Sequence, residues 1–156
     1  MAQKTNAIRI LESLGISYGT ASYEAGEEHA DAVAVARRLG VEPEILFKTL
    51  VARSEKGEIL VFCIPAPLEL ELKKAARAAG VKKVELIGLK ELHPLTGYVR
   101  GGCSPVGMKK SYRTWIDETA TLHERIYVNA GSRGLQMILA AAELARACAA
   151  GFADLG

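Results

Sequence analysis

The sequence predicts an α+β fold built on one mixed sheet, within one domain that spans residues 1–156. One observation favours this class, and a second favours a single domain. Segments with the apolar spacing of a helix are interspersed with short apolar runs typical of strands. The length of 156 residues is the usual size of one domain, and 49% of the residues are apolar while 24% are charged. No repeat, linker or low-complexity segment divides the chain.

Three segments show the apolar spacing of an amphipathic helix, and a fourth, shorter segment is also expected to be helical; each meets a residue that stops a helix. Thr5 or Asn6 can cap the first segment, and Gly15 ends it. Glycines also end the second and third segments, while Pro94 breaks the fourth. The expected helices are residues 6–14, 31–39, 68–79 and 89–93.

Strands are expected where short apolar runs lie between turn residues. Residues 45–52 and 58–64 are two such runs about a polar turn that ends in Gly57, a pattern that predicts a β-hairpin. The alanine-rich stretch 134–150 favours a single helix by propensity. The other expected strands are residues 16–23, 83–86, 113–117 and 125–129.

Composition and short motifs exclude several classes of protein. No apolar run approaches the roughly 20 residues that span a bilayer, and the N-terminus lacks the apolar segment of a signal peptide. We therefore expect a cytoplasmic protein that does not enter a membrane. Three cysteines without a Cys-x-x-Cys pair disfavour both a disulfide framework and a zinc site. We expect no metal and no cofactor, and we expect His29 to cap a helix or lie at the surface.

The net charge of +2 does not mark a nucleic-acid binder, although basic residues cluster locally. Local patches matter more to a phosphate backbone than net charge does. Runs of charge are more often solvated surface, and the pattern alone favours that interpretation. The clusters are Lys73, Lys74, Arg77, Lys82 and Lys83, and then Lys109, Lys110 and Arg113.

Lys48 is the strongest candidate for a catalytic residue, because it interrupts the apolar run at 45–52. Side chains alternate along a strand, so Lys48 shares a face with Leu50 and Ala52 and is expected to project from an apolar surface. An ammonium group buried without a partner is costly. A lysine in an apolar pocket suits work on a carbonyl or an ester, as a donor to an oxyanion or as an amine. The alternative is an edge-strand lysine that prevents aggregation.

Two glycine-rich loops are further candidates. The loop at 101–105, GGCSP, can bring backbone N–H groups close to a ligand, or it can be a simple bulge. The loop at 129–134 carries Arg133 between glycines and can bind a phosphate, or it can be a simple turn. No histidine is placed to activate Cys103, which disfavours this residue as a nucleophile. Tyr23 ends a strand and can place its hydroxyl in a pocket, although packing is the commoner role.

Five blocks of sequence are informative when they are considered as a set. They are FKTL at 47–50, LKKAA at 72–76, VKKVE at 81–85, TGYVRGGCSPVG at 96–107 followed by two lysines, and residues 126–134 from IYV to RG. Each block alone is weak, but the set is specific and covers nearly the whole chain. In this order the blocks resemble the YbaK/EbsC family.

The resemblance implies a mixed, barrel-like sheet surrounded by helices, and a C-terminus in which residues 134–139 form a strand and only 141–149 a helix. It also implies a trans-editing enzyme that hydrolyses mischarged aminoacyl-tRNA, in this branch Cys-tRNA(Pro). In the family mechanism the thiol of the substrate attacks its own carbonyl. The implied partners are the acceptor end of aminoacyl-tRNA and prolyl-tRNA synthetase, which would supply the tRNA selectivity.

Carried over residue by residue, the resemblance makes Lys48 the essential lysine. Cys103 falls where the family carries an aliphatic residue, which further disfavours it as a nucleophile. The expected substrate-binding residues are Tyr23, Phe47, Gly101, Gly102, Ser104, Pro105, Gly131, Arg133 and Gly134.

Three alternatives remain open. The first is a deacylase for alanine or another small amino acid on tRNA. The second is a non-catalytic module that binds aminoacyl-tRNA without accelerating ester loss. The third is an enzyme that forms a Schiff base between Lys48 and a small carbonyl compound, which borohydride would trap.

Overall fold

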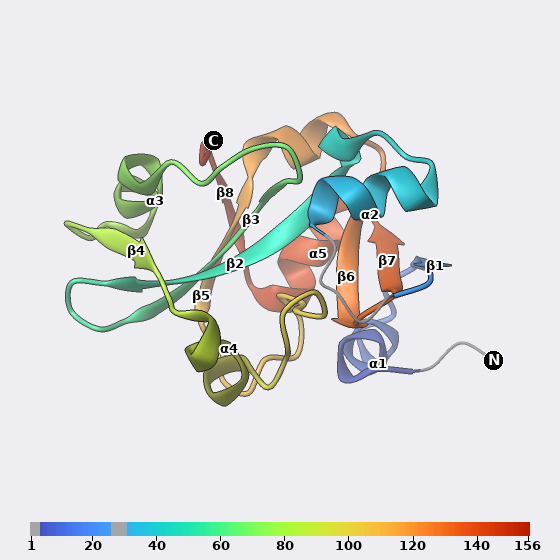
Figure 1. The fold of residues 1–156 in the computed structure, drawn as a ribbon, viewed down its shortest axis with the longest axis horizontal. Helices are drawn as coiled ribbons and strands as arrows, with labels where there is room; N and C mark the ends of the chain where they lie inside the picture. Colours follow the sequence, from blue (N-terminus) through green and yellow to red (C-terminus); the bar gives the residue numbers. More distant parts are fainter. Residues whose placement is uncertain (1–3, 26–30) are drawn as a thin grey trace.

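The computed structural model describes residues 4–25 and 31–156, and the expectation for His29 lies outside these ranges. The described residues form a mixed sheet with helices packed around it, which confirms the α+β class (Figure 1). The helices are α1 (Asn6–Ser13), α2 (Ala32–Leu39), α3 (Leu72–Ala79), α4 (Leu89–Thr96) and α5 (Ala141–Cys148), with 3-10 turns at Pro43–Ile45 and Glu118–Leu122. The strands are β1 (Gly19–Ser22), β2 (Leu46–Ser54), β3 (Ile59–Pro65), β4 (Val84–Leu86), β5 (Arg113–Asp117), β6 (Ile126–Ser132), β7 (Leu135–Leu139) and β8 (Gly151–Ala153).

The strands of the sheet run in the order β1-β7-β6-β2-β3-β5-β8, and β4 pairs with β2 outside this path. Three of the pairs are parallel, namely β2 with β6, β3 with β5, and β5 with β8. The other pairs are antiparallel, and the expected hairpin is β2 and β3. No helix in the described ranges is long and apolar enough to cross a membrane.

One curved face of the sheet encloses the largest core cluster. Phe47 of β2, Ile116 of β5 and Met137 of β7 belong to this cluster, although their strands lie far apart in the sheet order. Leu11 of α1 and Leu144 of α5 fill the space between them. Because side chains alternate along a strand, the neighbours of these core residues point to the opposite face.

The predicted cap of α1 and the predicted glycine end of α2 are confirmed, and Asp31 is a cap that was not predicted. The hydroxyl of Thr5 accepts a hydrogen bond from the backbone N–H of Ile8 at 3.2 Å and begins α1. The carboxylate of Asp31 accepts one from the N–H of Ala34 at 2.8 Å and begins α2. Gly40 adopts the left-handed conformation that ends α2.

Two predicted helix boundaries are wrong. Helix α3 begins at Leu72 instead of residue 68, because the side chain of Glu71 caps it by accepting a hydrogen bond from the N–H of Lys73. Pro94 lies inside α4 and does not end the helix at residue 93. The proline removes one helical N–H, and the carbonyl left without that donor belongs to Lys90, an exposed residue.

The C-terminal prediction from alanine content is also wrong, and the strand followed by a helix that the family resemblance implies is confirmed. Strand β7 pairs with β1 on one side and β6 on the other, and it buries alternate side chains in the core. These contacts outweigh helix propensities of a few tenths of a kcal/mol per residue. The strand expected at 16–23 is shorter than predicted, and β8 was not predicted.

Candidate active site

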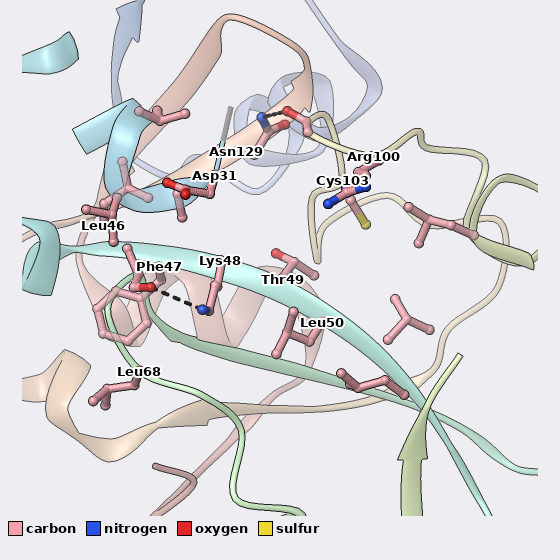
Figure 2. Close-up of a pocket in the computed structure, with 18 of the residues that line it drawn as sticks. Asp31, Leu46, Phe47, Lys48, Thr49, Leu50, Leu68, Arg100, Cys103 and Asn129 are labelled. Carbon is pink, nitrogen blue, oxygen red and sulfur yellow. Dashed lines mark hydrogen bonds between the residues drawn. The ribbon is translucent and has the colours of Figure 1, made fainter. Parts of the chain in front are cut away.

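A cavity of about 520 Å³ opens over β2 (Figure 2). Residues of α2 and α4 line it, and these two helices lie on either side of β2 (Figure 1). This volume lies in the ordinary range of small-molecule sites. Apolar side chains of β2, α2 and α4 form much of its wall, and a few polar groups project into it. The polar and charged residues of the lining are Tyr23, Asp31, Lys48, Thr49, Glu69, Arg100, Asn129 and Gln136.

The cavity lies where β2 lacks a strand partner on one edge. On that edge β6 pairs with Leu46 and Phe47, whereas β4 pairs only with residues 52–54. Residues 48–51 lie between these two partners, where the N–H of Ile87 donates to the carbonyl of Val51. The divergence of β4 and β6 therefore opens the sheet at Lys48.

Lys48 projects into this opening and is half-buried. Its ammonium donates a hydrogen bond to the backbone carbonyl oxygen of Ala66 at 3.1 Å (Figure 2). Burial disfavours the charged form and lowers the pKa of Lys48, while the nearby charges of Glu69 and Asp31 oppose this shift. An ammonium carries three N–H donors, so the one contact described leaves donors for a ligand.

Asn129 ties the two glycine loops together. Its Nδ2 donates to the carbonyl oxygen of Gly101 at 3.0 Å and to that of Ser132 at 3.2 Å. Its Oδ1 accepts from the N–H of Gly131 at 2.6 Å and from that of Ser132 at 3.2 Å. Both ends of the amide are thus used inside the protein. Asn129 therefore fixes the position of Gly101 at the edge of the cavity.

Four predicted site residues line the cavity, and they meet it in different ways. Lys48 projects into it, and Gly101 contributes backbone from its loop. Tyr23 is held at the wall because its N–H donates to the carbonyl of Gly134 at 2.9 Å. The side chain of Phe47 is only 1% exposed and packs in the core.

The other predicted site residues are not among those that line the cavity. Ser104 is buried and its hydroxyl accepts a hydrogen bond from the N–H of Val106 at 3.2 Å, so it shapes its own loop. Arg133 is exposed, and its Nε donates to the carbonyl of Arg100 at 2.8 Å. Their contact with substrate stays a prediction. The same holds for Gly102, Pro105, Gly131 and Gly134.

Gly131 and Gly134 have a structural requirement of their own. Both have positive φ angles, of 95° and 85°. A Cβ atom at Gly131 would lie 2.8 Å from the ring of Tyr98, and one at Gly134 would lie 2.7 Å from the carbonyl oxygen of Tyr23. Glycine is therefore needed at both positions to let these segments approach.

Sequence reasoning missed Asn129 and Gln136. Asn129 pairs directly with Gln136, and their neighbours Val128 and Met137 point into the core. Both residues therefore project from the face that carries Lys48. The signal was available for Gln136, since a polar residue interrupts the apolar run at 135–139 in the same way as Lys48 interrupts its own strand.

Cys103 lines the cavity, but its chemistry is unfavourable for a nucleophile. Burial raises the pKa of the Cys103 thiol to about 12, so the thiolate is scarce near neutral pH. No histidine is among the described residues that line the cavity. The prediction that Cys103 is not the nucleophile agrees with this environment.

Comparison with known families matches residues 26–147 to the aminoacyl-tRNA editing domain. The chain is 47% identical over 138 residues to a protein of Enterococcus faecalis that is provisionally named Cys-tRNA(Pro)/Cys-tRNA(Cys) deacylase EbsC, covering 88% of this chain and 84% of that protein. It is 31% identical over 72 residues to the proline–tRNA ligase of Brachyspira hyodysenteriae, covering 46% of this chain and 12% of the ligase. A crystal structure provisionally described as a trans-editing enzyme for prolyl-tRNA synthetase shares the fold, with a TM-score of 0.79 at 24% identity over 99% of this chain and 98% of that one.

Proposed function

The chain belongs to the aminoacyl-tRNA editing domain family, and we propose that it hydrolyses the ester bond of mischarged tRNA, with Cys-tRNA(Pro) as its substrate. The observation that carries this proposal is the ammonium of Lys48 at the opening of the sheet, in a cavity of about 520 Å³. That volume admits an aminoacyl group together with part of the terminal adenosine. The name of the Enterococcus faecalis relative supports cysteine as the amino acid.

Lys48 acts on the ester carbonyl. Negative charge develops on the carbonyl oxygen during attack, and a fixed N–H donor in a partly dehydrated site stabilises it by several kcal/mol. The hydrogen bond to Ala66 holds the ammonium in place before the substrate arrives. The walls of the cavity restrict the orientations of the aminoacyl group, which lowers the entropic barrier to reaction.

The nucleophile is the thiol of the cysteinyl group itself. Its sulfur bonds to the carbonyl carbon, the bond from that carbon to the ribose oxygen breaks, and the thiol proton passes to the released ribose oxygen. The products are free tRNA and a cyclic thiolactone, which water then opens. The high pKa of Cys103 supports this assignment, because that thiol is a poor alternative nucleophile. Alanine and proline carry no such group.

The tRNA meets the protein through its phosphate backbone. Arg100 lies in the lining of the cavity, and Lys109 and Lys110 lie in the exposed segment that follows the first glycine loop. Cationic contacts of this kind weaken as salt is added. Because such contacts do not read bases, we propose that prolyl-tRNA synthetase supplies the tRNA selectivity in a complex.

The proposal is tested with the wild-type protein on Cys-tRNA(Pro), Ala-tRNA(Pro) and Pro-tRNA(Pro). We expect rapid loss of cysteine alone. Faster loss of alanine would assign the chain to deacylation of a different small amino acid and contradict the thiol mechanism. Binding of charged tRNA without ester loss would establish a non-catalytic module instead.

A further inference from the structure

Gln136 carries a side-chain oxygen that pairs with none of the residues the structure describes. The residue is only 3% exposed, and it lines the cavity. Its Oε1 has no hydrogen-bond partner among the residues the structure describes. A buried acceptor without a donor is destabilising, and buried acceptors in folded proteins nearly always have one. The group therefore requires an explanation outside the packing of the sheet.

Asn129 and Gln136 differ in the hydrogen bonds that their side-chain amides make. The two residues are directly opposite each other on β6 and β7. The amide of Asn129 makes four hydrogen bonds that hold the glycine loops. The Oε1 of Gln136 makes none with the same described residues. An apolar residue of similar size would satisfy this position better if packing alone decided it.

We propose that Gln136 recognises the α-amino group of the bound aminoacyl ester, by accepting a hydrogen bond from it on Oε1. The inference rests on the proposed function and identifies the part of the substrate that one cavity residue reads. The last torsion of a glutamine side chain is broad and roughly two-fold, so the amide can turn and present its oxygen to a ligand.

The position of Gln136 favours the aminoacyl group over the rest of the tRNA. Lys48 and Gln136 lie on the same face of the sheet, on β2 and β7, which are separated by β6. Two strand spacings place their backbones about 10 Å apart. The body of the tRNA must remain outside the cavity, so the aminoacyl end is the part that reaches a nearly buried residue.

The α-amino group is the strongest hydrogen-bond donor that an aminoacyl end brings to this depth. A thiol is a weak donor by comparison. A site that pairs a buried acceptor with a substrate N–H rejects an analogue without it, because the acceptor is then left unpaired. The structure therefore predicts selectivity for free aminoacyl esters over acyl esters that lack the amine.

The test compares two variants and three esters by their kcat/KM values. Gln136→Met keeps the length of the side chain and removes the acceptor, whereas Gln136→Glu keeps an acceptor. The substrates are Cys-tRNA(Pro), 3-mercaptopropionyl-tRNA(Pro), which lacks only the amine, and Cys-tRNA(Pro) ending in 2′-deoxyadenosine. We expect Gln136→Met to lose roughly tenfold on both cysteinyl substrates and nothing on the 3-mercaptopropionyl ester. Gln136→Glu should keep the wild-type preference for the amine.

Other outcomes overturn the inference. Equal losses on all three esters would make the amide a structural element. A loss that disappears on the 2′-deoxy substrate would assign Gln136 to the ribose hydroxyl. An unchanged preference of Gln136→Met for the esters with the amine would show that the amide does not recognise the amine. If Gln136→Met does not fold, loss of that preference in Gln136→Glu, which keeps an acceptor, would also overturn the inference. Wild-type inactivity on every ester would instead overturn the proposed function, and this inference with it.

Discussion

The side-chain amide of Asn129 donates a hydrogen bond to the backbone carbonyl of Gly101 at 3.0 Å, across 28 positions of the sequence. This contact joins strand β6 to the loop at the edge of the cavity. The other end of the same amide accepts from Gly131 and Ser132. The geometry of both glycine loops therefore depends on one side chain that projects from the same sheet face as Lys48.

Replacing Asn129 with Asp should weaken both the fold and the activity. The carboxylate keeps the acceptor for Gly131 but loses both donors and faces the carbonyls of Gly101 and Ser132. We expect the free energy of unfolding to fall by about 1–3 kcal/mol, measured by urea denaturation, and kcat/KM to fall with it. The control is Asn6→Asp, which removes an exposed hydrogen bond to Gly107. Equal effects of the two changes would contradict a special role for Asn129.

Gly134→Ala should destabilise the protein by more than the conformational cost alone. Gly134 and Gly57 both have φ angles of 85°. An added Cβ at Gly57 meets nothing within 4 Å, whereas one at Gly134 meets the carbonyl oxygen of Tyr23 at 2.7 Å. The left-handed backbone should lower the free energy of unfolding of both alanine variants by about 1–2 kcal/mol. The loss should be larger for Gly134→Ala. Thermal unfolding of the pair measures the difference, and equal melting temperatures would mean that the contact with Tyr23 relaxes freely.

The fold was predictable from sequence wherever local signals agree with tertiary contacts. The hairpin of β2 and β3 follows from two apolar runs about a turn, and the end of α2 follows from Gly40. Local signals failed at the C-terminus, because alanine propensity carries no information about the two neighbours of β7. There the family resemblance succeeded where propensity did not. The short strand β8 has no pattern of its own and depends on pairing with β5.

The site was only partly predictable for a related reason. Lys48 stands out because it interrupts an apolar strand, and Gln136 gives the same signal in a segment first interpreted as helix. The gap in the sheet at Lys48 depends on where β4 and β6 end against β2, which no local pattern encodes. Glycine motifs also draw attention to the loops themselves, whereas Asn129, which fixes them, is visible only in three dimensions.

The pH profile should report the ionisation of Lys48. If the ammonium stabilises the oxyanion, the enzymatic rate falls as pH rises through the pKa of Lys48, which burial lowers. Glu69 opposes that shift by favouring the charged form. Glu69→Gln should therefore lower the pKa further and move the alkaline limb to lower pH, because the ammonium is lost earlier. Rates of deacylation are measured after subtraction of spontaneous ester loss.

The exposed Glu124, which is not part of the cavity lining, offers a control of equal charge change for this experiment. Glu124→Gln should leave the alkaline limb where it is. The titration of the substrate thiol is common to all three proteins and cancels in the comparison. A limb that moves to higher pH in Glu69→Gln, or a rate that keeps rising with pH, would contradict the role of the ammonium.

Cys103→Ala should retain most of the deacylation activity. Burial raises the pKa of Cys103 to about 12, and the proposed mechanism draws its thiol from the substrate. The assay is loss of cysteine from Cys-tRNA(Pro), with Cys148→Ala as a control at a half-buried position outside the cavity lining. Complete inactivity of a folded Cys103→Ala protein would instead make this thiol the nucleophile.

Deacylation of Cys-tRNA(Pro) by Lys48→Ala tests the central claim most directly. The matched control is Lys56→Ala, which removes an exposed lysine in the turn between β2 and β3. Melting temperatures of both variants establish that they fold. We predict that Lys48→Ala loses about 10²–10³-fold in kcat, as expected for an oxyanion donor, while Lys56→Ala keeps the wild-type rate. A folded Lys48→Ala protein that turns over Cys-tRNA(Pro) at a near wild-type rate would contradict the account.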